Sequence, residues 1–372
     1  MHSLGWPAYR AKQIARWVYG RGIFDFRAMT DLPLEAREVL VARARAHSGE
    51  VVTRLHAADG TSKFAIAFPD GQVIETVLLA YRFGYSVCVS TQAGCRMGCR
   101  FCASTIGGRA RDLTAGEMMT QVLIAHAEAL ARPANGNAGL DPDDPDSLAS
   151  LTPDGGTADL LGVRRVVLMG SGEPFDNYDQ VVDFIRRLMD PEFLGLGARR
   201  ITVSTSGVVP GILQLAHSGL GVQLAVSLHA PDDDTRTRLM PVNKKWPIRE
   251  VVAASKEYFQ LTGRRVTFEY ALIKNVNDSK AHAEALARLL SGFPCHVNVI
   301  RLNPVTAGKF EPADKYTVEE FVATLAAWGV AVTVRRRLGI EIDAACGQLR
   351  RRFVPTFSVG GGANGGEDEP CV

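Results

Sequence analysis

Apolar, β-branched runs alternate with amphipathic stretches through the middle of the chain, and this alternation predicts the core architecture. A run such as Val166-Val167-Leu168-Met169 is apolar at every position, as expected for a parallel strand covered on both faces. The predicted strands cover residues 85–91, 165–169, 200–204, 222–228, 265–273 and 296–302. The helices predicted between them cover residues 114–131, 178–190, 208–217, 248–262 and 279–291. These repeats predict an α/β fold, a partial (β/α)6 barrel, with functional groups after the C-terminal ends of the strands.

Smaller units are predicted on either side of the barrel. Residues 8–47 are predicted to be helical, and residues 63–68 and 73–81 are predicted strands joined by the turn Pro69-Asp70-Gly71. A further helix at 317–328 and a strand at 332–336 follow the barrel.

These patterns divide the chain into five predicted parts. They are an N-terminal helical accessory domain, a β-hairpin-like connector, the barrel, a C-terminal extension and a tail, over residues 1–48, 49–83, 84–310, 311–357 and 358–372. Within the barrel, residues 133–158 are rich in Asp, Gly, Pro and Ser and are predicted to form a mobile insertion, and the Gly-rich tail is predicted to be disordered.

Composition and charge narrow the class of protein. Of the 372 residues, 46% are hydrophobic and 22% are charged, which is typical of a folded globular protein and not of a disordered chain. The formal net charge is only +2, so a nucleic-acid surface would have to come from the local placement of charge. No apolar run approaches the ~18 residues of a membrane helix, and the N-terminal residues lack the pattern of a signal peptide. We therefore expect a cytoplasmic protein with no membrane partner.

The cysteines are concentrated in one place. They occupy positions 88, 95, 99, 102, 295, 346 and 371, an odd number that does not suit a disulfide framework. Cys95, Cys99 and Cys102 directly follow the first barrel strand with the spacing Cys-x3-Cys-x2-Cys. A structural zinc site usually has four protein ligands, whereas a [4Fe-4S] cluster held by three thiolates leaves one iron open for a substrate. The spacing favours the cluster, with structural zinc as the alternative.

This spacing resembles that of the radical S-adenosylmethionine (SAM) enzymes. In those enzymes the open iron binds the methionine end of SAM, and an injected electron cleaves a carbon–sulfur bond to give a 5′-deoxyadenosyl radical. The resemblance implies one [4Fe-4S] cluster per chain, held by Cys95, Cys99 and Cys102, and SAM as the second cofactor.

Small polar groups that suit SAM follow several of the predicted strands. Gly172 and Glu173 lie in the run Gly170-Ser171-Gly172-Glu173-Pro174, where glycine allows close backbone approach and the carboxylate can accept hydrogen bonds from an ammonium group. The other candidate SAM contacts are Ser204, Ser227, Leu228, His229 and Asn303. Taken singly, each is a strand terminator or a helix cap as readily as a ligand. Their shared position at one edge of the barrel favours a binding site.

Two further motifs indicate which radical SAM family the chain resembles. Cys88 precedes Cys95 by seven residues, and Cys346 lies in the run Ala344-Ala345-Cys346-Gly347-Gln348-Leu349. Together with residues 74–78, 204–210, 239–245 and 268–270, these motifs closely resemble the radical SAM RNA adenine-C2 methyltransferases of the RlmN family over about residues 5–353. Ser171 departs from the family, which usually has Met there, and Arg301 stands where an apolar residue is usual.

The resemblance implies a chemistry for two distant thiols. One SAM methylates the cysteine that matches Cys346, and a second SAM, two per turnover in all, supplies the radical that removes a hydrogen from this S-methyl group. The carbon radical adds to carbon 2 of adenine, Cys88 resolves the adduct through a disulfide with Cys346, and Glu75 accepts a proton. Without the resemblance, Cys88 would be a buried hydrophobic residue as readily as a reactive thiol.

The resemblance also implies RNA as the partner. The substrates would be 23S ribosomal RNA and, as a second, tRNA at the adenosine 3′ to the anticodon, with a flavodoxin-type or similar electron donor and a monomeric enzyme. Candidate phosphate contacts are Arg10, Lys12, Arg16, Arg21, Arg27, Arg96, Arg100, Arg335, Arg336 and Arg337. The alternatives are a carbon-8 adenosine methyltransferase that confers antibiotic resistance and a non-catalytic RNA-binding protein with a structural metal.

Overall fold

One large sheet organises the molecule. The computed structural model describes residues 4–81, 84–132, 162–302, 310–336 and 338–342. The ten strands of the sheet, in spatial order, are β1 (Glu50–His56), β2 (Ser62–Ala67), β3 (Val73–Tyr81), β4 (Gly84–Cys88), β7 (Val163–Leu168), β8 (Ile201–Thr205), β9 (Gln223–Ser227), β10 (Val266–Leu272), β11 (Cys295–Arg301) and β12 (Ala331–Val334). Strands β1 to β4 are antiparallel neighbours, and β4 and β7 to β12 are parallel.

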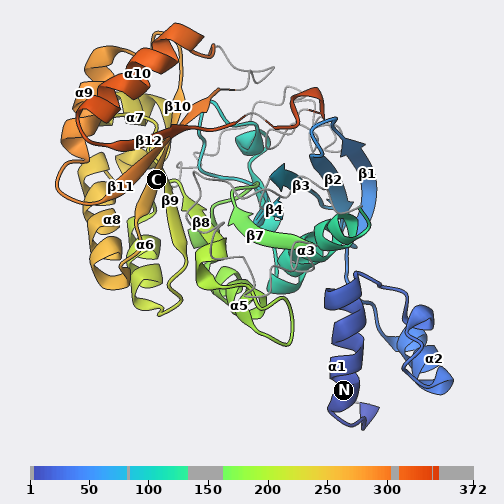
Figure 1. Cartoon of the computed structure of the whole chain (residues 1–372). Coiled ribbons are helices and arrows are strands. Elements are labelled where there is room, and N and C mark those ends of the chain that lie inside the picture. The colour runs from blue at the N-terminus through green and yellow to red at the C-terminus, as the bar shows by residue number, and fades with distance from the viewer. Residues whose placement is uncertain (1–3, 82–83, 133–161, 303–309, 337, 343–372) are drawn as a thin grey trace, which may run out of the picture.

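A helical crossover joins each parallel strand to the next. The crossover helices are α3 (Ala115–Leu130), α5 (Tyr178–Met189), α6 (Val209–His217), α7 (Asp233–Leu239) with α8 (Ile248–Thr262), α9 (Lys280–Leu289) and α10 (Lys315–Ala327). Figure 1 shows α6, α8, α9 and α10 along the outer side of strands β8 to β12. Because successive strands lie side by side in chain order, every crossover advances the sheet in the same direction. The predicted α/β fold, with alternating parallel strands and helices, is confirmed.

Local sequence signals explain where these elements begin. Helix α3 starts at a capping box, in which Thr114 and Glu117 each accept a hydrogen bond from the other residue's backbone N–H. Side chains of the parallel strands, such as Val166, Val203 and Val226, are fully buried in the main core.

The sheet is larger than the sequence predicts in two places. The connector at 49–83 contains the extra strand β1, whose alternating exposure marks a sheet edge and gives a weak apolar pattern. Strand β12, which the sequence places inside the C-terminal extension, pairs in parallel with β11, so the sheet continues past residue 310. The predicted insertion at 133–158 and the tail at 358–372 lie outside the described residues.

The N-terminal residues form a helical unit that packs on α3. Helix α1 (Tyr9–Ala15) is followed by a π-helical turn η2 (Arg16–Gly20), a 3-10 turn η3 (Phe26–Ala28) and helix α2 (Leu34–Arg43). Figure 1 shows α1 and α2 projecting away from the sheet. Trp17 and Val18 are buried in the main core, and the Cα of Ala127 lies only 2.7 Å from where a Cβ on Gly22 would stand. Among the described helices, none is long and apolar enough to cross a membrane.

Candidate functional site

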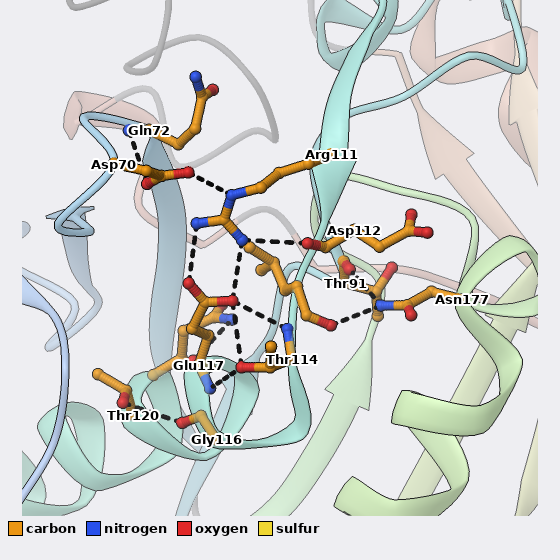
Figure 2. A network of polar contacts seen from close by, with 12 residues as sticks. Asp70, Gln72, Thr91, Arg111, Asp112, Thr114, Gly116, Glu117, Thr120 and Asn177 are labelled. Carbon is orange, nitrogen blue, oxygen red and sulfur yellow. Dashed lines mark hydrogen bonds and ion pairs between the residues drawn. The ribbon is translucent and has the colours of Figure 1, made fainter.

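The three clustered cysteines lie on a loop that a small hairpin closes. Strands β5 (Gln92–Gly94) and β6 (Arg109–Asp112) form this hairpin, and residues 95–108 make up the loop between them. Figure 2 shows Arg111 at the base of the hairpin, paired with Asp70 of the β2–β3 turn and with Glu117 of α3, whose two oxygens lie 2.9 and 2.8 Å from the guanidinium nitrogens. The hairpin is thus fixed to the sheet and to α3 by charge-assisted hydrogen bonds.

All three cysteine side chains face the same pocket. Cys95, Cys99 and Cys102 line a pocket of about 280 Å³, in which Cys95 and Cys99 are buried and Cys102 is partly exposed. Burial raises the pKa of Cys95 to about 12 and that of Cys99 well above its usual value, and the neighbouring thiols act in the same direction. Without bound metal these thiols are protonated at neutral pH. Positive charge from iron would make the thiolates stable here.

The arrangement suits an iron–sulfur cluster better than one metal ion. Within the described ranges, no three His, Cys, Asp or Glu side chains converge as ligands of a single ion. A four-iron cubane is larger than a single ion, and its thiolate ligands sit at separate corners, further apart. Three thiols line one pocket, and three is the number of protein ligands of a [4Fe-4S] cluster that keeps one iron open.

The loop after β7 forms the second wall of the pocket. Glu173 is buried, and one of its carboxylate oxygens accepts hydrogen bonds from the N–H and hydroxyl groups of Ser206 at 2.7 and 2.8 Å. Burial raises the pKa of Glu173, and the hydrogen bonds from Ser206 act against this shift. Gly172 has φ +116°, and a Cβ there would stand 2.5 Å from the hydroxyl oxygen of Thr91, so both backbone conformation and space require glycine.

This second loop is tied directly to the cysteine loop. The carbonyl oxygen of Ser171 accepts hydrogen bonds from the backbone N–H groups of Thr91 and Gln92, and the hydroxyl of Ser171 lies 3.1 Å from that of Ser104. Arg96 forms a two-pronged ion pair with Asp176, with nitrogen–oxygen distances of 2.6 and 2.8 Å. Ser171, where the resembled family usually has Met, is therefore a buried link between the two loops.

The candidate residues at the ends of β8 and β9 divide into two groups. Ser204, Ser227 and His229 line the pocket, together with Gly172 and Glu173. Leu228 is not among the lining residues, and its fully buried side chain lies in the main core. Asn303 lies outside the described residues.

His229 is held neutral and in one orientation. Its φ is +55°, its Nδ1 accepts a hydrogen bond of 2.9 Å from the N–H of Ala271, and the ring of Phe101 packs edge-on at 4.8 Å. Burial lowers the pKa of His229 to about 3. The neutral ring therefore carries its proton on Nε2, as a donor.

Cys88 and Glu75 occupy the same face of the sheet beside the pocket. Cys88 is buried with Val77, which pairs with it across β3 and β4, and with Met169, which lines the pocket. Glu75 is buried on β3, and its carboxylate lies 2.9 Å from the ammonium of Lys63 on β2. Cys346 is outside the described part of the chain, so the distance between the two predicted reactive thiols is not defined.

Lys63 and Arg236 are buried charges that the motif analysis missed. Lys63 and Glu75 carry opposite charges within two apolar strands joined by a turn, and this pattern could have predicted their pairing. No comparable signal exists for Arg236, which lies in a polar helix and is nevertheless fully buried.

The predicted phosphate contacts differ in their surroundings. Arg21 stacks on the ring of Trp17 at 4.1 Å, Lys12 pairs with Glu192 at 2.9 Å, and Arg335 lines the pocket. Arg337 lies outside the described residues.

Close packing at Gly170 gives a first test of the site's construction. A Cβ at Gly170 would stand 2.7 Å from backbone atoms of Val89 and Ser90, so Gly170→Ala must push apart the segments that follow β4 and β7. We expect a loss of about 1–3 kcal/mol in the free energy of unfolding, measured by thermal or denaturant unfolding. Gly197→Ala is the matched control, because a Cβ there would have nothing within 4 Å of it and the φ of Gly197 is −63°. Equal stability of the two variants would contradict the packing described here.

The chain is similar to two known protein families and to individual bacterial proteins. Residues 157–287 match the Radical SAM superfamily, and residues 1–45 match the ribosomal RNA large subunit methyltransferase N-terminal domain. The probable dual-specificity RNA methyltransferase RlmN of Pelotomaculum thermopropionicum is 48% identical over 353 residues, which cover 94% of this chain and 88% of that protein. The protein of the same name from Symbiobacterium thermophilum is 46% identical over 354 residues, which cover 95% and 88%.

A solved structure is similar over most of the chain. The crystal structure of a radical SAM methyltransferase from Sphaerobacter thermophilus superposes with a TM-score of 0.82 and 44% identity, covering 93% of this chain and 94% of that one.

Proposed function

The chain belongs to the RlmN family of radical SAM RNA methyltransferases, and from this membership we propose that it methylates carbon 2 of one adenosine in the peptidyl-transferase centre of 23S ribosomal RNA. The observation that carries the proposal is the pocket at the ends of the parallel strands, where three cysteines meet Glu173 and His229. Carbon 2 of adenine lies between two ring nitrogens and is too electron-poor to attack a methyl donor, so a radical route suits it. The dual specificity in the relatives' names supports tRNA as a second substrate.

The residues around the pocket are proposed to hold the cofactors. Cys95, Cys99 and Cys102 would ligate one [4Fe-4S] cluster. When bound, the cluster supplies the electron that cleaves SAM, and it would receive this electron from a flavodoxin-type donor. Glu173 would accept hydrogen bonds from the ammonium group of SAM, and Nε2 of His229 would donate a hydrogen bond to SAM. Ser204 and Ser227 line the same pocket and would bind further polar groups of SAM.

Three further residues are proposed to act on the methyl group and the base. Cys346 would carry the methyl group as S-methylcysteine, and Cys88 would form a disulfide with Cys346 as the methylated base is released. Glu75 would accept the proton lost from carbon 2, and its ion pair with Lys63 fixes the position of the carboxylate. The position of Cys88 beside Met169 of the pocket wall supports its access to the reacting groups.

The proposal is tested by analysing RNA from cells. The gene would be expressed in a bacterium that lacks its own adenine-C2 methyltransferase, and 23S rRNA fragments and tRNA would be examined by mass spectrometry. We expect 2-methyladenosine in the rRNA, and its presence in tRNA would establish the second substrate. If the product is 8-methyladenosine, the enzyme methylates carbon 8, and the proposal of carbon 2 is wrong. An anaerobically purified protein with stoichiometric zinc and no iron would instead favour a non-catalytic RNA-binding protein.

A further inference from the structure

Arg236 is a buried guanidinium with an unusual set of partners. It lies on α7 and is fully buried, behind the pocket wall formed by Ser206 and Ser227. Its Nη2 donates to the carbonyl oxygen of Ser206 at 2.6 Å and its Nη1 to the side-chain oxygen of Asn243 at 2.8 Å. Longer bonds reach the carbonyl oxygens of Leu228, Ser227 and Trp246. Each of these acceptors is neutral, so the hydrogen bonds solvate the charge without cancelling it.

The charge of Arg236 persists at neutral pH. Burial lowers the pKa of Arg236 to about 10, while Cys99 and Asp233 favour its charged form. Asp233 is exposed, and its carboxylate already accepts hydrogen bonds from the side chain of Asn243 at 2.9 Å and the N–H of Ile248 at 2.8 Å. Solvent screens an exposed carboxylate, so most of the positive charge of Arg236 remains for its buried surroundings.

The buried surroundings of Arg236 include the cysteine loop. Leu239 and Met240, one turn beyond Arg236, pack against Cys99 in one apolar group. The carbonyl oxygen of Leu239 accepts a hydrogen bond of 3.0 Å from the N–H of Arg100, which joins the end of α7 to the loop. Ser206, whose carbonyl oxygen accepts from Nη2 of Arg236, lines the same pocket as the three cysteines. Arg236 and Cys99 are thus both buried, and Leu239 and Met240 connect them.

We propose that Arg236 is a fixed counter-charge for the cluster and raises its reduction potential. A [4Fe-4S] core with three thiolates carries one net negative charge, and the electron from a low-potential one-electron donor adds a second. A nearby positive charge at low dielectric stabilises the doubly negative state more than the singly negative one, so it favours acceptance of the electron. Arg236 acts through the cluster and is therefore a positioning residue. The inference rests on the cluster of the proposed function.

The test measures the midpoint potential of the anaerobically purified full-length protein, without SAM or RNA, by redox titration followed by electron paramagnetic resonance. Arg236→Met removes the charge, Arg236→Lys keeps it, and both lose hydrogen bonds and some thermal stability. We expect a lower midpoint potential for Arg236→Met and a value near wild type for Arg236→Lys. Arg264→Met is the matched control. Arg264 lies just before β10 begins, at the ends of the parallel strands opposite the pocket, and donates a hydrogen bond to the carbonyl oxygen of Gly221. The potential of this control should equal that of wild type.

Two results would overturn the inference. The first is an Arg236→Met potential equal to that of wild type, and the second is an equal shift in Arg236→Lys and Arg236→Met, which would reveal a structural effect instead of a charge effect. If Arg236→Met fails to bind iron, Arg236→Gln provides the test, since it removes the charge and keeps side-chain hydrogen-bond donors. It should lower the potential, and an unchanged or higher value contradicts the inference. A wild-type protein that binds no iron would instead contradict the proposed function.

Discussion

Replacing any one of the three loop cysteines with alanine is expected to remove bound iron completely. In Cys95→Ala, Cys99→Ala and Cys102→Ala, two thiolates remain, and the cluster needs three. The loop cannot easily supply a substitute. It is fixed at its base by the β5–β6 hairpin, and residues 95–108 contain no other Cys and no His, Asp or Glu. Without the cluster, SAM cleavage should fall to background.

Iron content per chain and deoxyadenosine formation with a chemical reductant measure these losses separately. Cys295→Ala is the matched control, because Cys295 is also a buried free cysteine but begins β11, at the opposite ends of the parallel strands from the pocket. It should retain wild-type iron and SAM cleavage. Full deoxyadenosine production by any of the three loop variants would remove that cysteine from the proposed ligand set.

Much of the fold could be predicted because the parallel strands are locally unambiguous. A strand covered on both faces is apolar where it is buried, as Leu224, Ala225 and Val226 of β9 are, and the amphipathic helices between such strands follow a 3.6-residue period. The elements missed by sequence analysis lack these signals. Helix α7 has seven mostly polar residues, and β5 and β6 are short strands whose pairing depends on the loop they enclose.

The candidate site was predictable where its chemistry lies within one short segment. The cysteine spacing and the glycines before Glu173 are local, and both segments line the pocket. Leu228 stays a prediction, since its neighbours Ser227 and His229 line the pocket while its own side chain enters the core. The surroundings of Arg236 depend on contacts between distant segments, which neither periodicity nor spacing reports.

The two remaining candidate thiols should fail at different stages of the reaction. We expect Cys346→Ala to receive no methyl group from SAM and to form no covalent bond to RNA, with its iron content unchanged. Cys88→Ala should still methylate Cys346 and attack the base. It lacks the thiol that would resolve the adduct, so it should accumulate with RNA attached.

Denaturing gels of each variant purified from cells, before and after nuclease treatment, distinguish these outcomes. A nuclease-sensitive species of reduced mobility is expected for Cys88→Ala alone, and Cys295→Ala should migrate as wild type. The packing of Cys88 with Val77 and Met169 gives a structural alternative, in which alanine leaves a small cavity and lowers stability by about 1 kcal/mol or more without trapping RNA. A cavity destabilises the protein whether or not RNA is present, whereas a trapped adduct requires that methyl transfer to Cys346 has already occurred. Equal mobility of Cys88→Ala and Cys346→Ala would therefore assign a structural role to at least one thiol and contradict the methylcysteine mechanism for this chain.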